Sequence, residues 1–175
     1  MAKQSSDTGS PTPYWLDDPP DKVYLTDNDP DVVAVTLTAW EFAQLINNRD
    51  YTSLDSSVEY HLYTAGYRQE LVRKKDPKRT AKYFKSNKIK SSCPDSTLVS
   101  LRFSNKLSEA EITYAVKIVV TAATDKYFKS MNNKLEGKQL AKNVPYEQLY
   151  MLHLVKEAGM WKIDYFEADS IITVL

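Results

Sequence analysis

Apolar residues crowd one stretch in the first third of the chain and predict its first helix. Between positions 39 and 46 they occupy most of the circumference of a helix: Ala39, Trp40, Phe42, Ala43, Leu45 and Ile46. Asp29-Pro30-Asp31 is a start signal, since proline is tolerated in a first turn. A second start with capping-box spacing lies at Thr38, so an irregularity near residues 36–38 stays open. We expect one helix from about residue 31 to 48, largely buried because it is apolar nearly all round.

Segment 51–71 is the second segment in which apolar residues have helical spacing. Aliphatic residues are spaced four residues apart, at Leu54, Val58 and Leu62. Tyrosines are spaced three and four residues apart, at Tyr60, Tyr63 and Tyr67. This pattern predicts a second helix whose tyrosine stripe packs on a sheet edge. The alternative is an aromatic platform for a ligand.

After a turn cluster at residues 91–95 the period changes to two, which is typical of strands. We expect strands at 97–103, 112–121, 148–156 and 161–166, a long loop at 132–145, and a short end strand at 171–175. The residues expected to share inward faces are Ile112, Tyr114, Val116, Ile118 and Val120, then Tyr150, Leu152 and Leu154, then Trp161, Ile163 and Tyr165. The opposite face of the second strand carries Thr113, Lys117 and Thr121, so it meets water at least in part.

Segregated helices and strands predict an α+β protein, with N-terminal helices packed in a curved antiparallel sheet. We interpret residues 1–30, rich in Ser, Thr, Pro and Asp, as a flexible N-terminal linker, and residues 31–175 as a single domain. Tyr14 and Trp15 either fasten the linker to the domain or stay loosely ordered.

Charge is distributed unevenly along the chain. The 23 basic and 23 acidic residues balance, which argues against a nucleic-acid binder driven by bulk charge. Cations nevertheless concentrate at residues 68–90, and acidic residues at 17–31. The candidate contacts to an anionic surface are Arg73, Lys74, Lys75, Lys78 and Arg79. Tyr83 and Phe84 lie among these basic residues, an arrangement that a nucleic-acid or anionic-lipid site would use. We favour instead a solvated helix whose aromatic side chains face inward.

No motif predicts catalysis, a metal or a cofactor. His61 and His153 are far apart, no Cys or His has metal-ligand spacing, and the four glycines build no phosphate loop. The single Cys93 excludes an internal disulfide. No acid–base pair is identifiable, because we expect Asp164 to point outward and Asp50 to cap a turn.

No stretch approaches the roughly 20 apolar residues of a membrane helix. The first residues have no apolar core and so do not form a signal peptide. Both a cytosolic start and a start just after a removed membrane anchor remain open.

Two segments resemble a known superfamily. The run A-x-x-F-A-x-L-I-N-N-R-D-Y-x-x-L, Ala39 to Leu54, is similar to the first helix and following turn of the nuclear-transport-factor-two-like cone fold. The closing V-K-E-A-G-M-W-K-I-D-Y-F, Val155 to Phe166, resembles that fold's last hairpin. The superfamily includes ketosteroid isomerases, small dehydratases and non-catalytic domains. Among the last are extracytoplasmic components of type IV secretion and conjugation channels, whose linker the N-terminal tail resembles.

The resemblance and the absence of a catalytic signature together predict a non-catalytic protein-interaction domain of a bacterial cell envelope. Its expected partners are other protein subunits, including further copies of itself, and the candidate contact face is Thr113, Lys117 and Thr121. The alternative function is a small-molecule enzyme or binder that uses the cone interior, and the alternative location is the cytoplasm. Binding of nucleic acid or anionic lipid through residues 68–90 is a third, less favoured expectation.

Overall fold

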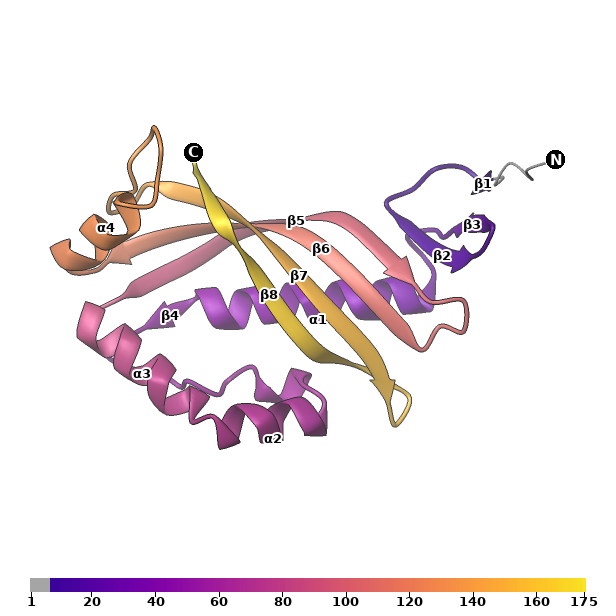
Figure 1. Ribbon diagram of the computed structural model, residues 1–175, viewed down its shortest axis with the longest axis horizontal. Coiled ribbons are helices and arrows are strands. Elements are labelled where there is room, and N and C mark those ends of the chain that lie inside the picture. The colour runs from indigo at the N-terminus through magenta and orange to yellow at the C-terminus, as the bar shows by residue number, and fades with distance from the viewer. Residues whose placement is uncertain (1–6) are drawn as a thin grey trace.

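One mixed β-sheet organises the computed structural model, which describes residues 7–175 (Figure 1). Its four long strands are β5 (Lys90–Phe103), β6 (Glu109–Ala122), β7 (Pro145–Glu157) and β8 (Met160–Val174). Short strands are β1 (Asp7–Thr8), β2 (Tyr14–Asp18), β3 (Asp21–Tyr24) and β4 (Arg49–Asp50). The helices are α1 (Pro30–Asn47), α2 (Ala65–Arg73), α3 (Asp76–Asn87) and α4 (Asp125–Asn132), with a 3₁₀ turn at Tyr60–Leu62. The α+β class is confirmed.

The strand order is β1-β3-β2-β5-β6-β7-β8, with β4 also pairing with β5. The long strands pair antiparallel, but β1 pairs with β3, and β2 with β5, in parallel. The sheet is therefore mixed rather than antiparallel throughout. The helices are also not N-terminal, because three strands precede α1 and α4 lies between β6 and β7.

The predicted linker, residues 1–30, differs from the structure over its described part. Tyr14, Trp15 and Leu16 pair with residues 101–103 of β5, and β3 pairs antiparallel with β2. The Asp- and Pro-rich composition hid this short hairpin, whose strands have only four or five residues. The portion of the predicted linker before residue 7 lies outside the described residues.

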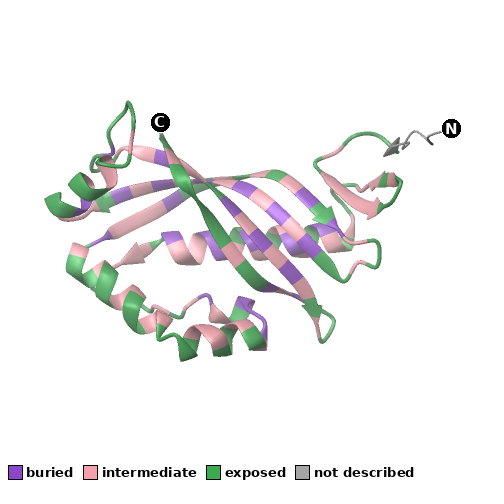
Figure 2. Cartoon of the chain, viewed as in Figure 1, coloured by how far each residue is buried: buried purple, intermediate pink, exposed green. Residues whose placement is uncertain are grey.

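Helix α1 is continuous from Pro30 to Asn47, which confirms a single helix close to the predicted bounds. The Asp29 side chain caps it by accepting hydrogen bonds from the backbone N–H groups of Asp31 and Val32. The long strands cross over α1, and the buried residues gather between them (Figure 2). The helix residues of this core are Val32, Val35, Ala39, Phe42 and Ala43.

The helix predicted over residues 51–71 is largely wrong in its first half. Asp50 and Asp55 each accept hydrogen bonds from the backbone N–H two residues later, which stabilises turns instead of a helix. Helical structure starts at the 3₁₀ turn and continues in α2 and α3. The expected packing on a sheet edge is confirmed at Tyr63, which forms a parallel bridge with Ile163 of the edge strand β8.

The alternation predicted for β6 and β7 is confirmed, because every expected inward residue of these two strands is buried. In β8 it holds for Trp161 and Ile163 but fails at Tyr165, which is exposed. A register shift between β7 and β8 at this point turns Phe166 inward instead. The turn predicted at residues 91–95 lies within β5, where the pairing with β6 is irregular.

Candidate protein-contact surface

Aromatic side chains fill the space between α1 and the sheet. The Phe42 ring lies 4.8 Å from Phe166 and 6.0 Å from Tyr63, measured between ring centroids. Tyr150 continues the stack, 5.0 Å from Phe166 and 5.6 Å from Tyr114. The rings meet edge-on or tilted, which is the favourable arrangement for aromatic pairs. This part of the interior is therefore a packed core rather than a ligand chamber.

Two tyrosine hydroxyls in this core differ in their partners. The Tyr150 hydroxyl donates to Asn47 Oδ1 at 3.0 Å, and burial raises the pKa of Tyr150 to about 12. The buried Tyr114 hydroxyl has no hydrogen-bond partner among the described residues. Burial raises the pKa of Tyr114 well above its ordinary value, so this tyrosine stays a neutral phenol.

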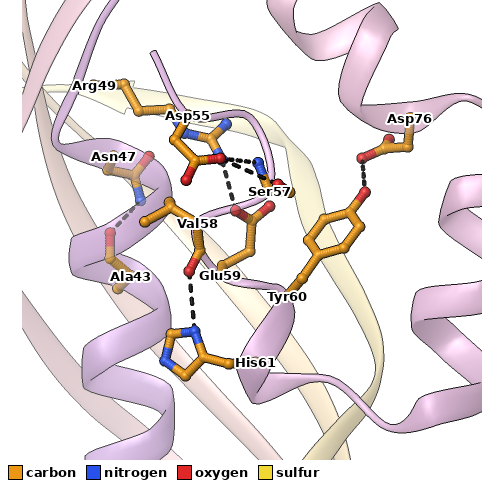
Figure 3. Close-up of polar contacts among 10 residues, drawn as sticks. All are labelled: Ala43, Asn47, Arg49, Asp55, Ser57, Val58, Glu59, Tyr60, His61 and Asp76. Atoms are coloured by element: carbon orange, nitrogen blue, oxygen red, sulfur yellow. Dashed lines mark hydrogen bonds and ion pairs between the residues drawn. The ribbon is translucent and has the colours of Figure 1, made fainter. Parts of the chain in front are cut away.

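A buried ion pair fastens the turns at residues 50–59 to the end of α1 (Figure 3). Arg49 Nη2 lies 3.0 Å from Glu59 Oε2, and both side chains are more than nine-tenths buried. Burial raises the pKa of Glu59, while the positive charge of Arg49 opposes that rise. Because this carboxylate is held by Arg49, it is not a free general base.

A second carboxylate–tyrosine contact joins the 3₁₀ turn to α3. The Tyr60 hydroxyl donates to Asp76 Oδ2 at 2.9 Å (Figure 3). Burial, reinforced by Asp76, raises the pKa of Tyr60. The contact ties the first turn of α3 to the tyrosine stripe, so its role in the structure is to position a helix.

A cavity of about 220 Å³ remains beneath α3 and α4. Its walls include the side chains of Tyr83, Tyr127 and Tyr146, with apolar residues between them, and it contains no carboxylate. An isomerase-like site needs a carboxylate base in an apolar pocket, and this cavity does not provide one.

The outer side of α1 carries an exposed apolar stripe, Val33, Leu37 and Trp40, which we call the α1 stripe. These residues are 40%, 60% and 55% exposed, respectively. They are spaced four and three residues apart, so they share one face of the helix. The expectation that Trp40 is buried is wrong. Phe42 faces the sheet and is fully buried, and Trp40 lies two residues away on the opposite side of α1.

The α1 stripe adjoins an open edge of the sheet. Strand β4 covers β5 at Lys90 and Ser91, and β2 covers it from Leu101, but no other described strand pairs with that edge in between. Trp40 reaches this edge, because it lines a small cavity together with Ser96 and Leu98 of β5. An exposed aromatic beside unpaired strand backbone is a combination that protein partners use.

The predicted contact residues Thr113, Lys117 and Thr121 lie on the outer face of β6, but they do not form one site. Thr113 lines a groove of about 410 Å³ beside Leu149, Met151 and an irregular stretch of β8. Lys117 stands opposite Asp95 of β5 and Glu147 of β7 in the strand register. Thr121 lines a separate cavity of about 580 Å³ at the end of α1. Their role in contact stays a prediction.

The predicted anionic-surface residues lie on α2, on α3 and in the connection between the helices. Arg73 and Lys74 both pair with Glu70, and Arg79 donates to the Lys74 carbonyl. All five are exposed: Arg73, Lys74, Lys75, Lys78 and Arg79. Phe84 packs against the core, as expected of an inward aromatic, whereas Tyr83 is half exposed.

Sequence reasoning missed the α1 stripe because it assigned the whole helix to the interior. The spacing of Val33, Leu37 and Trp40 was a usable signal, since it marks a face separate from that of Val32, Val35, Ala39 and Phe42.

No family model matches the chain, and no curated protein matches it. In the described part of the chain, no cluster of three or more His, Cys, Asp or Glu side chains is placed to hold a metal ion. None of the helices in residues 7–175 combines the length and apolar character needed to cross a membrane.

Proposed function

We propose that this chain is a non-catalytic protein-interaction domain that works in a larger assembly through the α1 stripe. One observation carries the proposal: the helix that anchors the core also presents Val33, Leu37 and Trp40 to solvent. Exposed large apolar residues gathered on one face mark interaction sites more often than scattered ones do. Tryptophan is also enriched among the residues that dominate binding energy.

The arrangement of elements supports a finer proposal, that the fold is the cone of the nuclear-transport-factor-two-like superfamily. A long helix lies along one face of four long antiparallel strands, with two shorter helices beyond it (Figure 1). The two segments that resemble the superfamily, 39–54 and 155–166, correspond here to α1 with its following turns and to the β7–β8 hairpin.

The specific form of the proposal is a cell-envelope component of a bacterial conjugation or secretion channel, on the extracytoplasmic side of a membrane. It rests on the resemblance alone. Immunodetection in fractions of the native organism tests it. Recovery with the envelope, together with protease sensitivity once the outer layers are opened, supports the proposal, and recovery only with the cytosol overturns it.

A photo-reactive residue at position 37 tests whether the α1 stripe is a contact surface. Leu37 is 60% exposed, and Met160 at the start of β8 is exposed to the same extent, so a probe at position 160 is a matched control. We expect cross-links to a defined protein subunit from position 37, and their loss in the Trp40→Asp variant. Equal cross-linking from positions 37 and 160, or none from either, overturns the proposed surface.

The alternative function, binding or conversion of a small molecule in the interior, has one observation in its favour, the tyrosine-lined cavity of about 220 Å³. The aromatic packing around Phe42 and the engagement of Glu59 by Arg49 weigh against it. A hydrophobic dye that bound this cavity, with Tyr146→Trp blocking its binding, would favour the alternative over an assembly role.

A further inference from the structure

The two ends of the molecule carry opposite charge. Helices α2 and α3 carry a group of cations that we call the basic face, and α3 lies toward one end of the molecule (Figure 1). These cations are Arg68, Arg73, Lys74, Lys75, Lys78, Arg79, Lys82, Lys85 and Lys88. Between residues 65 and 88 only Glu70 and Asp76 oppose them. At the other end, the β2–β3 hairpin and the chain leading to α1 form an acidic lobe, residues 14–29, with Asp17, Asp18, Asp21, Asp27 and Asp29. Lys22 is the lone cation in that lobe.

Most cations of the basic face form no ion pair with an acidic side chain in residues 7–175. Glu70 is engaged by Arg73 and Lys74, and Asp76 accepts the Tyr60 hydroxyl. Lys78, Lys82 and Lys85 are exposed at helical spacing on one side of α3. None of these three lysines forms an ion pair with any described residue. The opposite side of α3 packs inward through Phe84.

The acidic lobe also keeps exposed carboxylates. Asp17 pairs with Arg102, and Asp29 is used as the cap of α1. Asp27 accepts a hydrogen bond from the Tyr14 hydroxyl but is exposed, and Asp18 is exposed as well. The Lys22 ammonium lies 4.9 Å from the centre of the Trp15 ring. The lobe therefore presents a net negative surface at the start of the chain.

The basic face and the acidic lobe cannot meet within one molecule. Figure 1, drawn with the longest axis horizontal, shows α3 toward one end of that axis, the β2–β3 hairpin of the acidic lobe at the other end, and α2 between them. The carboxylate-rich counterpart that the basic face fits is therefore present on every other copy of the same chain. Two different complementary patches at opposite ends give head-to-tail contacts, which build open chains, or rings where the rotation between copies closes.

We propose that copies of this protein associate head to tail, with the basic face of α2 and α3 on one copy docked against the acidic lobe of the next. Exposed ion pairs contribute little one by one, so the contact is weak and depends on several charges acting together. It operates where copies are concentrated side by side, and it uses a surface separate from the α1 stripe.

Sedimentation equilibrium over a protein concentration series tests the proposal. The Debye length falls from about 30 Å at about 10 mM salt to about 3 Å at 1 M, so salt separates charge-driven from apolar association. At low salt we expect the weight-average mass to rise with concentration beyond that of a dimer, and at high salt to return to that of the monomer. A monomer mass at low salt, or a mass that stops at the dimer, overturns the proposal.

Charge reversal locates the contact. The triple variant Lys78→Glu/Lys82→Glu/Lys85→Glu changes exposed side chains on one side of α3 and should lower the association constant by about tenfold or more. Lys134→Glu/Lys138→Glu/Lys142→Glu is the matched control, because it produces the same net charge at exposed sites of the loop after α4. Equal weakening in both triple variants would mean a general charge effect and would overturn the proposal.

Rescue by the complementary change makes the test specific. By itself, the Asp18→Lys/Asp27→Lys variant should not associate. Mixing it with the α3 triple variant should restore association, because the new lysines of one variant can pair with the new glutamates of the other. Failure of the mixture to associate overturns the head-to-tail pairing.

Binding of the wild type to anionic vesicles or to duplex DNA, without self-association, would assign the basic face to a polyanion instead. The Trp40→Asp variant should keep the salt-dependent association, which separates this proposal from the proposed function.

Discussion

Trp161 and Asp31 join the last hairpin of the sheet to the first turn of α1. The Trp161 indole N–H donates to Asp31 Oδ1 at 2.9 Å, across 130 positions of sequence. Lys156 Nζ lies 3.1 Å from the same carboxylate oxygen and 5.2 Å from the centre of the Trp161 ring. The contact sets how α1 lies on the sheet, because it fixes the N-terminal end of the helix to the strand β8 that borders the core.

Removing the Asp31 carboxylate should destabilise the fold. Asp31→Ala loses the hydrogen bond from Trp161, the ion pair with Lys156, and a favourable acidic charge in the first turn of α1. We expect a loss of about 2 kcal/mol in the free energy of unfolding, measured by urea denaturation. A double-mutant cycle with Trp161→Phe should give a coupling energy of about 1 kcal/mol, and additive effects would show that the two residues do not interact.

Trp40 and Phe42 should respond oppositely to truncation, although they are two residues apart in one helix. Phe42→Ala empties a fully buried site and should cost about 3–5 kcal/mol. Trp40→Ala changes an exposed side chain and should alter the stability of the isolated protein by about 0.5 kcal/mol or less. Urea denaturation of both variants measures this difference. A large loss of stability in Trp40→Ala would place that ring in the core and remove the α1 stripe.

The sequence identified where α1 begins and ends, and which residues of β6 and β7 face inward, because these features depend on local signals. The Asp29 cap and the strict alternation from Ile112 to Val120 are such signals. Whether Trp40 is buried depends on how much of the helix the sheet covers, and local spacing does not contain that information. The short β2 strand was missed for the same reason, since only its pairing with distant β5 makes it a strand.

Phe166 and Tyr165 test the register shift in β8, where simple alternation predicted the wrong inward residue. Phe166 contacts Phe42 and Tyr150, whereas Tyr165 is exposed. Phe166→Ala should therefore cost about 3–5 kcal/mol, and Tyr165→Ala about 0.5 kcal/mol or less, in thermal or urea denaturation. The reverse ranking would show that β8 keeps an unbroken alternation through this point.

The buried pair of Arg49 and Glu59 should give the stability a distinct pH dependence. Burial raises the pKa of Glu59 above that of a glutamate in the unfolded chain, so the folded state binds the proton more tightly. The stability that this group contributes is complete below the ordinary glutamate pKa of about 4.3, and it is lost as the pH rises through the raised pKa. Glu59→Gln removes this titration. The stability of wild type relative to Glu59→Gln should therefore fall as the pH rises above the ordinary glutamate pKa of about 4.3.

Arg49 provides the control for this titration, because its positive charge lowers the pKa of Glu59. Arg49→Met removes that charge and should move the fall in stability to higher pH and make it larger. The variant also leaves Glu59 without its partner, which should cost about 3–5 kcal/mol near neutral pH. Urea midpoints of the wild type and the two variants, measured across the same pH range, give both effects. A constant difference between wild type and Glu59→Gln would show that the pKa of Glu59 is the same in the folded and unfolded states.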